Sequence, residues 1–369
     1  MHKKNILFIM HELSLGGAER VISNLVNNMS REQFNNELCL FKKKGSLIKS
    51  LKNDIIIYDL KAKRVATSIV TFVQLLIKKK PDIIFTSITH VNLLLSILIP
   101  FLRPFMRNTL FITREVNIPS IRAQHLKKSK KIDFFYRIFI HNYDYIIAQS
   151  NYMKKDIINS YGVSPTKIKV ISNPLDITNI HQKTDQIETN NLFNDNSKIN
   201  LVAVGNLRKQ KGFDTLLEII SLLDNEYHLN ILGDGNQKEF LEQKIKELEL
   251  QEKVTLHGMN TNPYKYMKAA NLVVLSSQYE GFPNVILEAN ACGKFVVTFQ
   301  CPGVSEEIIE NGVNGYLVEN GNIAQFADAI KKYSNYSHDE QKIIATTEKY
   351  KASNIVKEYE KIFLGNENE

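Results

Sequence analysis

Short apolar runs alternate with amphipathic stretches of about 10 to 15 residues through most of the first half of the chain. The runs NILFIMHE (5–12), PDIIFTS (81–87) and DYIIAQS (144–150) are typical of buried strands, and AERVISNLVNNM (18–29) repeats apolar residues with helical spacing. Strands separated by helices of this length indicate βαβ units and a parallel sheet. We therefore predict an α/β fold for this half of the chain.

The alternation weakens after Asn173-Pro174. A polar, turn-rich stretch follows and predicts a linker or exposed excursion at about 175–198. The alternation restarts at INLVAVGNL (199–207) and continues towards the end of the chain, which predicts a second βα domain.

The length of 369 residues also favours two domains, because a single core stops growing at roughly 250 to 300 residues. We place the domains at 1–174 and 175–346, and we expect a terminal helix, 347–366, to cross back to the first domain. Two doubly wound domains of this kind would face each other across a central cleft, with ligands beyond the carboxyl ends of the strands.

Three cysteines, Cys39, Cys292 and Cys301, lack C-x-x-C spacing, so the sequence predicts neither a disulfide framework nor a zinc site. We expect a reducing compartment. The first apolar run is only about seven residues and leads into a glycine turn, which favours a strand over a signal peptide. The apolar part of segment 91–111 is about a dozen residues, short of the roughly 20 that a membrane span needs.

Charge is distributed unevenly along the chain. Residues 1–180 hold 28 Lys and Arg against 12 Asp and Glu, a net charge of +16, whereas residues 181–369 hold 19 against 27, a net charge of −8. An excess of this kind suggests that the first half faces an anionic partner, either nucleic acid or a phospholipid surface. Solvated surface lysines are the alternative.

Glycine-rich turns follow the first strand of each domain. Gly16 and Gly17 stand before the helix at 18–29, where the backbone can approach a ligand closely. GNLRKQKGFD (205–214) follows the first strand of the second domain and joins Arg208 and Lys211 to a helix start, which predicts an anion site such as one for a diphosphate. GDGN (233–236) does not continue as G-x-G-x-x-G, so a nicotinamide site is not indicated.

The stretch EGFPNVILEANACG (280–293) predicts a strand exit at Glu280 and a helix that starts at Pro283, with Glu288 on its second turn. Carboxylates accept hydrogen bonds from vicinal hydroxyls, and the amides of Gly281, Phe282 and Asn284 would suit phosphate. Spacing alone leaves the alternative open that Glu280 is a helix cap and Glu288 a solvated residue.

These motifs together resemble the retaining glycosyltransferases of family 4, which have the GT-B fold of two Rossmann-like domains. The resemblance covers nearly the whole chain through GGAER (16–20), AQSNYMKKD (148–156), VGNLRKQKGFD (204–214), EGFPNVILEANACG and CPGVSEEIIENGVNGYLV (301–318). The last two, in this order, are highly specific.

The resemblance implies a role for each acid. Glu280 would contact the donor sugar, Gly281 to Asn284 would reach the sugar and the diphosphate, and Glu288 would hold the ribose. Lys211 matches the lysine that binds the diphosphate. The family's arginine has no counterpart, because Asn206 stands in its place, and Arg208 is the candidate substitute.

The implied activity is that of a hexosyltransferase without cofactor or metal. No Asp-x-Asp occurs, so Lys211, Arg208 and helix N-termini would offset the charge of the leaving diphosphate. We assign no general base, because in this family the leaving diphosphate is thought to take the acceptor's proton.

The acceptor is expected to meet the first domain. THVN (89–92) and TREVN (113–117) place polar residues at strand ends, and relatives have polar residues near the acceptor and the reacting sugar at similar positions. The candidate acceptor-binding residues are His90, Asn92, Arg114, Glu115 and Asn117, of which His90 and Glu115 are also candidates for a role at the reacting centre.

A basic and aromatic segment predicts contact with an anionic membrane surface. HLKKSKKIDFFYRIFIHNY (125–143) joins Lys127, Lys128, Lys130 and Lys131 to aromatic residues, as interfacial segments do. The family resemblance implies a polyprenyl-diphosphate saccharide as acceptor, an enzyme at the inner face of the cytoplasmic membrane, and no nucleic-acid partner. The apolar parts would otherwise simply cover the sheet.

Two other functions fit the same fold. One is a sugar-nucleotide isomerase of the 2-epimerase type, and the other is a non-catalytic sugar-nucleotide-binding subunit. The pairing of GGAER with EGFPN argues against the first, and the presence of both acids and Lys211 argues against the second.

Overall fold

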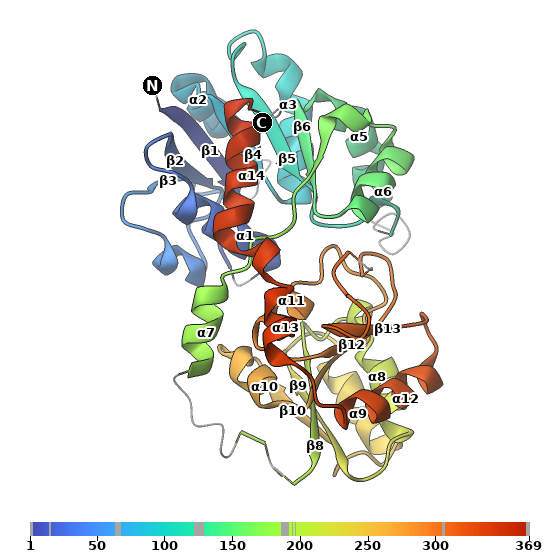
Figure 1. Cartoon of the computed structure of the whole chain (residues 1–369). Coiled ribbons are helices and arrows are strands. Elements are labelled where there is room, and N and C mark those ends of the chain that lie inside the picture. Colours follow the sequence, from blue (N-terminus) through green and yellow to red (C-terminus); the bar gives the residue numbers. More distant parts are fainter. Residues whose placement is uncertain are drawn as a thin grey trace. The chain divides into compact units, whose positions relative to one another are not determined.

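The structure is a computed structural model that describes residues 3–14, 16–62, 68–121, 129–185, 192–193, 195, 197–304 and 307–366, without the side chains of 129–132. The chain divides into two compact units (Figure 1). Unit 1 comprises residues 1–174 and 352–369, and unit 2 comprises residues 175–351. Each unit is an α/β domain, as the sequence predicts.

The described residues of unit 1 form a seven-stranded sheet in the order β3-β2-β1-β4-β5-β6-β7. All its strand pairs are parallel. The strands are β1 (Lys4–Met10), β2 (Phe34–Leu40), β3 (Ile56–Asp59), β4 (Ile83–Thr86), β5 (Leu110–Arg114), β6 (Tyr145–Ala148) and β7 (Ile168–Val170). The helices are α1 (Gly17–Asn28), α2 (Ile69–Lys79), α3 (Thr89–Leu102), α5 (Ser129–Phe139), α6 (Asn151–Tyr161) and α14 (Ala352–Leu364).

The last helix of the chain, α14, completes the core of unit 1. Apolar residues of β1 such as Phe8 pack in one cluster with Ile22 of α1 and with Tyr359 and Phe363 of α14. Phe85 of β4 contacts both α14 rings, at centroid distances of 5.6 and 5.8 Å. This burial explains why the chain returns to unit 1 after unit 2 is complete.

Unit 2 repeats the architecture with a six-stranded parallel sheet in the order β10-β9-β8-β11-β12-β13. The strands are β8 (Ile199–Val204), β9 (Tyr227–Leu232), β10 (Val254–Gly258), β11 (Leu272–Leu275), β12 (Val296–Phe299) and β13 (Gly315–Val318). The helices are α7 (Ile177–Asp185), α8 (Phe213–Ser221), α9 (Lys238–Glu247), α10 (Pro263–Ala269), α11 (Asn284–Ala291), α12 (Ile323–Ser334) and α13 (Glu340–Ala345).

Both faces of the unit 2 sheet are covered. Successive residues of β8 belong to different core clusters, since Leu201 and Ala203 join one and Val202 joins the other. This follows from the two-residue period of a strand. Strands buried on both faces read as continuous apolar runs, which is why the sequence reveals them.

Two expectations about element boundaries change. The stretch expected as a linker contains α7, because Ile177 and Ile180 are buried in a core cluster of unit 2 and Asp176 accepts a hydrogen bond from the amide of Asn179. The terminal helix spans Ala352–Leu364 rather than 347–366, since Glu348–Tyr350 form a separate turn, η6, whose Tyr350 packs in unit 2.

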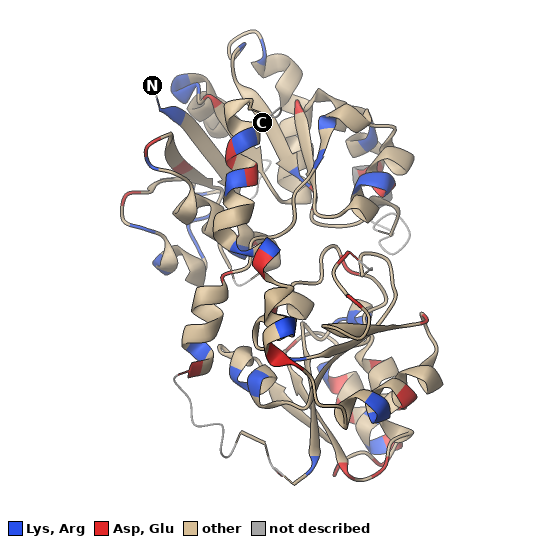
Figure 2. Cartoon of the chain, viewed as in Figure 1, with Lys and Arg blue, Asp and Glu red and all other residues tan. Residues whose placement is uncertain are grey.

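The basic excess of residues 1–180 falls almost wholly in unit 1, which contains residues 1–174 (Figure 2). Both signs of charge occur along α14 in the same view. The partition of charge along the sequence is therefore a partition between two folded units.

Candidate functional site

Both sheets have a switch point, where successive strands start to add on the opposite side. In unit 2 it lies between β8 and β11, and in unit 1 between β1 and β4. Loops that follow the two central strands diverge there, and in open α/β sheets this is where ligands bind. The residues predicted for the site follow these four strands or the neighbouring strand β5.

In unit 2, the loop after β8 lies against the end of β11. Gly212 has a φ of +61°, and a Cβ built on it would lie 2.2 Å from the carbonyl oxygen of Ser276. The hydroxyl of Ser276 donates to the carbonyl oxygen of Lys211 at 3.1 Å, and the amide of Gln278 donates to Gln210 O at 2.8 Å. Glycine at 212 therefore permits a contact that fixes Lys211 beside the exit of β11.

Glu280 forms the centre of this contact. Its side chain is 7% exposed, and Lys211 Nζ lies 2.6 Å from its Oε1. The hydroxyl of Ser277 donates to the same oxygen at 2.6 Å. The backbone amide of Glu280 donates to Pro302 O at 2.8 Å, so the turn Cys301–Gly303 after β12 helps to fix the backbone of Glu280. A carboxylate with an ammonium group and a hydroxyl on one oxygen is strongly held in place.

The surroundings of Glu280 are partly dehydrated. Burial, and then the charge of Glu280, raise the pKa of the Cys301 thiol to about 12 and also raise the pKa of Tyr279. Both groups are therefore neutral at physiological pH, and Cys301 supplies no thiolate. Lys211 remains the cation that balances the Glu280 carboxylate here.

The turn after Glu280 differs in detail from the expectation. Helix α11 starts at Asn284, with Pro283 at the N-cap position rather than inside the helix. The amide of Asn284 donates to Phe282 O at 3.0 Å, so it is not available to a phosphate in this structure. Phe282 packs on Tyr350 at a centroid distance of 6.2 Å, which anchors the turn to the core. Gly281 is the half-buried residue between Glu280 and this anchor.

The second acid, Glu288, lies on the second turn of α11 and is half-buried. The hydroxyl of Tyr264 on α10 donates to its Oε1 at 3.4 Å. Its role towards a ribose stays a prediction.

Asn206 and Arg208 are exposed on the loop after β8. Arg208 is the N-cap residue of the 3-10 turn η5 (Lys209–Lys211), and the amide of Lys211 donates to Arg208 O at 2.9 Å. One short turn thus carries the exposed guanidinium and the partly buried ammonium group. Among the described residues, no group of three or more His, Cys, Asp or Glu is arranged to hold a metal ion.

The switch point of unit 1 brings together two histidines. His11 follows β1, His90 lies in the first turn of α3, and their ring centroids are 5.2 Å apart in an edge-to-face arrangement. His11 also stacks on Phe41 at 6.3 Å. Partial burial of the ring, and then the neighbouring His11, lower the pKa of His90. His11 was not among the residues predicted from the sequence, although its place at the end of a buried strand was the available signal.

The glycine loop of unit 1 starts α1. Gly16 is the N-cap residue, and a Cβ built on it would lie 2.1 Å from Glu19 Oε2. Gly17 is exposed as the first residue of the helix. Burial, opposed in part by a backbone hydrogen bond, raises the pKa of Glu19, and Glu12 adds to this. The loop therefore carries acids as well as glycines.

Three candidate acceptor residues lie inside unit 1. Asn92, Arg114 and Glu115 are each at most 1% exposed. Arg114 donates to Ser87 Oγ at 2.9 Å and to Asn173 Oδ1, and Tyr359 of α14 lies beside it.

The other two buried groups belong to the same polar core. Asn92 Nδ2 donates to Arg114 O at 3.1 Å, and the Tyr136 hydroxyl donates to Glu115 Oε1. Contact between these side chains and an acceptor would require them to leave such partners, so their positions indicate that they hold the strand ends together. His90 and Asn117, by contrast, are exposed, although the His90 ring is covered on one side by its contact with His11.

The predicted membrane segment is described in part. Lys127 and Lys128 lie outside the described residues, and Lys130 and Lys131 lie in α5 without described side chains. On the same helix Phe134, Phe135 and Ile138 are 61%, 47% and 50% exposed, whereas Tyr136 is buried. No described helix is long and apolar enough to cross a membrane.

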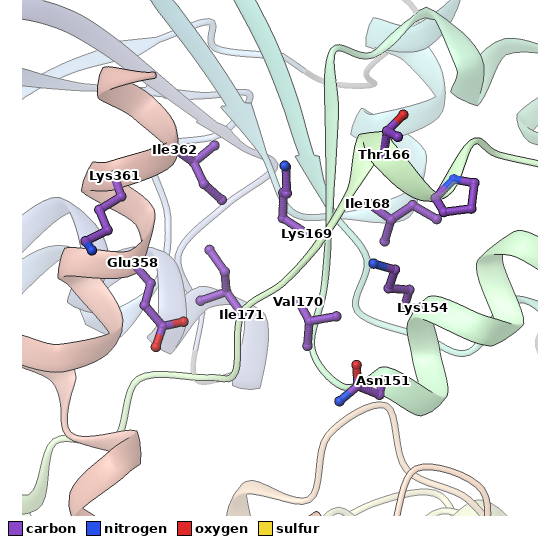
Figure 3. Close-up of a pocket in the computed structure, with 11 residues that line it drawn as sticks. Asn151, Lys154, Thr166, Ile168, Lys169, Val170, Ile171, Glu358, Lys361 and Ile362 are labelled. Carbon is purple, nitrogen blue, oxygen red and sulfur yellow. The ribbon is translucent and has the colours of Figure 1, made fainter. Parts of the chain in front are cut away.

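A separate groove lies in unit 1 along β7, an edge strand, between α6 and α14 (Figure 3). Its volume is about 500 Å³, and Lys154, Lys169 and Lys361 line it together with Ile168 and Ile362. It contains none of the residues predicted for the site, which cluster towards the centre of the sheets.

Comparisons with known proteins fit this geometry. The profile of the family "Glycosyltransferase Family 4" matches residues 15–179, and that of "Glycosyl transferases group 1" matches residues 183–350. The chain belongs to the family 4, group 1 glycosyltransferases. The two matched regions lie largely within unit 1 and unit 2 respectively.

The glycosyltransferase chain has curated relatives of several kinds. It is 31% identical over 219 residues to an N-acetylgalactosamine-N,N'-diacetylbacillosaminyl-diphospho-undecaprenol 4-alpha-N-acetylgalactosaminyltransferase of Campylobacter jejuni, covering 59% of this chain and 58% of the relative. It is 25% identical to a lipopolysaccharide 1,6-galactosyltransferase of Salmonella typhimurium, covering 90% and 92%. Matches to the Campylobacter protein and three other relatives span only 48% to 61% of their lengths.

A solved structure shares the fold. Anabaena HepE in complex with UDP-glucose has a TM-score of 0.78 and 21% identity, covering 98% of this chain and all of that chain. This likeness shows that the glycosyltransferase has the GT-B fold.

Proposed function

We propose that the protein is a retaining glycosyltransferase that moves a sugar from a nucleotide-sugar to a lipid-linked saccharide during synthesis of a bacterial surface glycan. The observation that carries this proposal is the carboxylate of Glu280, held by Lys211 and Ser277 at the switch point of unit 2. A fixed, nearly buried carboxylate beside a cationic turn suits a sugar attached to a diphosphate.

The donor is proposed to lie along the loops after β8 and β11. Glu280 accepts hydrogen bonds from sugar hydroxyls, Lys211 and Arg208 bind the diphosphate, and Glu288 accepts from the ribose hydroxyls. Asn206 and the turn Gly281–Asn284 line the same edge, and Gly16 and Gly17 of unit 1 are proposed to approach the donor. A UDP-hexose or a UDP-N-acetylhexosamine is favoured, because HepE was solved with UDP and with UDP-glucose and the Campylobacter relative transfers N-acetylgalactosamine.

The proposed reaction breaks the bond between the anomeric carbon and the diphosphate oxygen, and the acceptor oxygen attacks the same face. The acceptor's proton passes to the leaving diphosphate oxygen, so no protein base is needed. Lys211 and Arg208 offset the charge that develops on the diphosphate, without a metal ion. Glu280 positions the sugar and is not a nucleophile.

The acceptor is proposed to meet unit 1 through the exposed residues His90 and Asn117. Asn92, Arg114 and Glu115 would then position these strand ends from inside. The name of the Campylobacter relative includes a diphospho-undecaprenol acceptor, which supports a polyprenyl-diphosphate saccharide here. The exposed apolar side chains of α5 support a peripheral position on an anionic membrane.

A transfer assay tests the proposal. Purified protein is incubated with a panel of UDP-, GDP- and dTDP-sugars and a polyprenyl-diphosphate saccharide, with and without chelator. We expect one nucleotide-sugar to be consumed only with acceptor present, at a rate that chelator leaves unchanged. Isomerisation of the free nucleotide-sugar, or binding without turnover, would contradict the proposal, and a rate restored by magnesium would overturn its metal-free part.

A further inference from the structure

The hydroxyl of Ser277 has a contact that the proposed donor site does not yet explain. Ser277 follows β11 by two residues and is 1% exposed. Its Oγ donates to Glu280 Oε1 at 2.6 Å, within the range of a strong hydrogen bond to a carboxylate. This contact joins two residues of one loop, so it does not connect separate parts of the fold.

Lys211 and Ser277 both engage the same carboxylate oxygen of Glu280. Their contacts hold Oε1 between Lys211, on the loop after β8, and Ser277, on the loop after β11, and neither residue bonds Oε2. A sugar hydroxyl would therefore meet Oε2, whose direction follows from how firmly Oε1 is held. The contacts at Oε1 thus orient the carboxylate, and Oε2 is the oxygen that would accept a hydrogen bond from the ligand.

The two groups that hold Oε1 are not equivalent when the donor is bound. Lys211 carries the charge proposed to bind the diphosphate, so the donor competes with Glu280 for its ammonium group. Ser277 is neutral and buried, so the charge of the diphosphate does not attract its hydroxyl as it attracts the ammonium group of Lys211. The hydroxyl of Ser277 can therefore still donate a hydrogen bond to Oε1 when Lys211 shares its hydrogen bonds between Glu280 and the diphosphate.

We propose that Ser277 is a positioning residue for the transferred sugar, acting through Glu280 rather than through contact with the donor. This inference rests on the proposed function. It assigns to Ser277 the fixed orientation of Glu280 in the donor complex, and to Lys211 the link between the carboxylate and the diphosphate.

Ser276, the neighbouring residue, provides a matched control. It is 3% exposed, but its hydroxyl donates to the main-chain oxygen of Lys211 at 3.1 Å instead of to Glu280. Loss of that hydrogen bond would loosen the loop that carries Lys211. It would therefore weaken binding of the nucleoside diphosphate and of the nucleotide-sugar to the same extent. Loss of the hydrogen bond from Ser277 would weaken only the binding and transfer of the nucleotide-sugar, because the nucleoside diphosphate has no sugar for Glu280 to contact.

The experiment compares Ser277→Ala, Ser277→Thr and Ser276→Ala with the unmodified full chain. Calorimetric titration gives the affinity for the nucleotide-sugar consumed in the panel assay and for the corresponding nucleoside diphosphate, and kcat and KM follow from transfer. We expect Ser277→Ala to lower kcat/KM or nucleotide-sugar affinity by about tenfold or more, as loss of a hydrogen bond to a charged group does. Affinity for the nucleoside diphosphate should stay within about twofold, since that ligand has no sugar.

The threonine variant keeps a hydroxyl, so it should recover more of the nucleotide-sugar affinity than alanine, and it covers the case in which alanine disturbs folding. Ser276→Ala should change both affinities in parallel. Equal losses for both ligands in Ser277→Ala, or an unchanged sugar-dependent affinity, would overturn the inference while leaving the proposed function intact. Absence of any nucleotide or nucleotide-sugar binding by the unmodified chain would instead overturn the proposed function.

Discussion

The two units share one scaffold but place different chemistry at the same point of the sheet. The switch point of unit 2 joins Lys211 to Glu280, an ion pair whose side chains are 18% and 7% exposed. The switch point of unit 1 joins two aromatic side chains, His11 and His90, in ring contact, and partial burial followed by the neighbouring His11 lowers the pKa of His90. The sheet order brings loops together in both units, and the residue type at the strand end decides which ligand each can bind.

The units also differ in the exposure of an arginine near each switch point. In unit 1, the guanidinium of Arg114 is enclosed by Ser87, Asn173 and Tyr359, so its charge is used inside the fold. In unit 2, Arg208 is exposed on the loop beside Lys211. An internal cation contributes to stability and an exposed cation near a switch point is available to an anion, so one residue type serves two purposes.

The largest effect is expected from Glu280→Ala. Removing the carboxylate deprives the donor sugar of the group that accepts its hydrogen bonds, and it deprives Lys211 of its ion-pair partner. Transfer should therefore fall by about a hundredfold or more. Transfer of labelled sugar to the acceptor measures this loss. Glu239→Ala, at an exposed acid of α9, is the control and should transfer normally. Near-normal turnover by Glu280→Ala would contradict the proposal that Glu280 of unit 2 binds the donor sugar.

A pair of arginine variants separates the two uses of charge. Arg114→Met should lower the free energy of unfolding by about 2 to 4 kcal/mol, because it leaves the buried Ser87 and Asn173 groups without their partner. Arg208→Met should leave stability within about 0.5 kcal/mol, since the side chain is exposed, and should weaken nucleoside diphosphate binding by about tenfold. Urea unfolding and calorimetric titration give the two quantities. The opposite pattern would mean that the arginines have exchanged roles.

The exposed apolar side chains of α5 should distinguish unit 1 from unit 2 at a membrane. We expect Phe134→Ser, Phe135→Ser and Ile138→Ser together to lower binding to vesicles of phosphatidylglycerol and phosphatidylcholine by about tenfold, because these side chains would insert at the interface. Co-sedimentation measures the bound fraction. Leu222→Ser with Met259→Ser, at exposed apolar positions of unit 2, is the matched control and should bind as before. Equal binding by both variants would contradict a membrane role for α5.

The smallest effect concerns pH and the histidine pair. An unfolded histidine titrates near pH 6.5, whereas burial and His11 lower the pKa of folded His90. Below about pH 6.5 the unfolded chain therefore binds a proton that folded His90 resists, and stability decreases as the pH falls through this window.

His90→Gln should reduce that decrease only slightly, because His90 is exposed and solvent screens its interactions, as urea unfolding at about pH 7.5 and about pH 5.5 would measure. The exposed His141→Gln is the control and should keep the dependence of the unmodified chain. A steeper loss of stability in His90→Gln on acidification would contradict the sign of this effect.

Much of the fold is readable from the sequence because parallel strands buried on both faces are continuous apolar runs. Helix α7 was hidden, since only Ile177 and Ile180 mark its buried side amid polar residues. The α/β class and the GT-B fold are confirmed, whereas the ends of α7 and α14 depended on packing that local pattern does not reveal.

The site was predictable as a set of loops but not as a set of contacts. Lys211 and Glu280 are 69 positions apart, and only the order of β8 and β11 brings them together. The position of Arg114 at a strand end does not tell whether its side chain faces inward, because its neighbour Tyr359 comes from the last helix of the chain. Ser277 carried no signal in the sequence at all, since its importance follows from a single distance.

The most direct test of the central claim is a crystal structure of the protein with an unreactive phosphonate analogue of the nucleotide-sugar that the assay identifies. We expect a sugar hydroxyl within about 3 Å of Glu280 Oε2, with Ser277 still on Oε1 and Lys211 at the diphosphate. A sugar bound away from Glu280, or a diphosphate that contacts neither Lys211 nor Arg208, would contradict it.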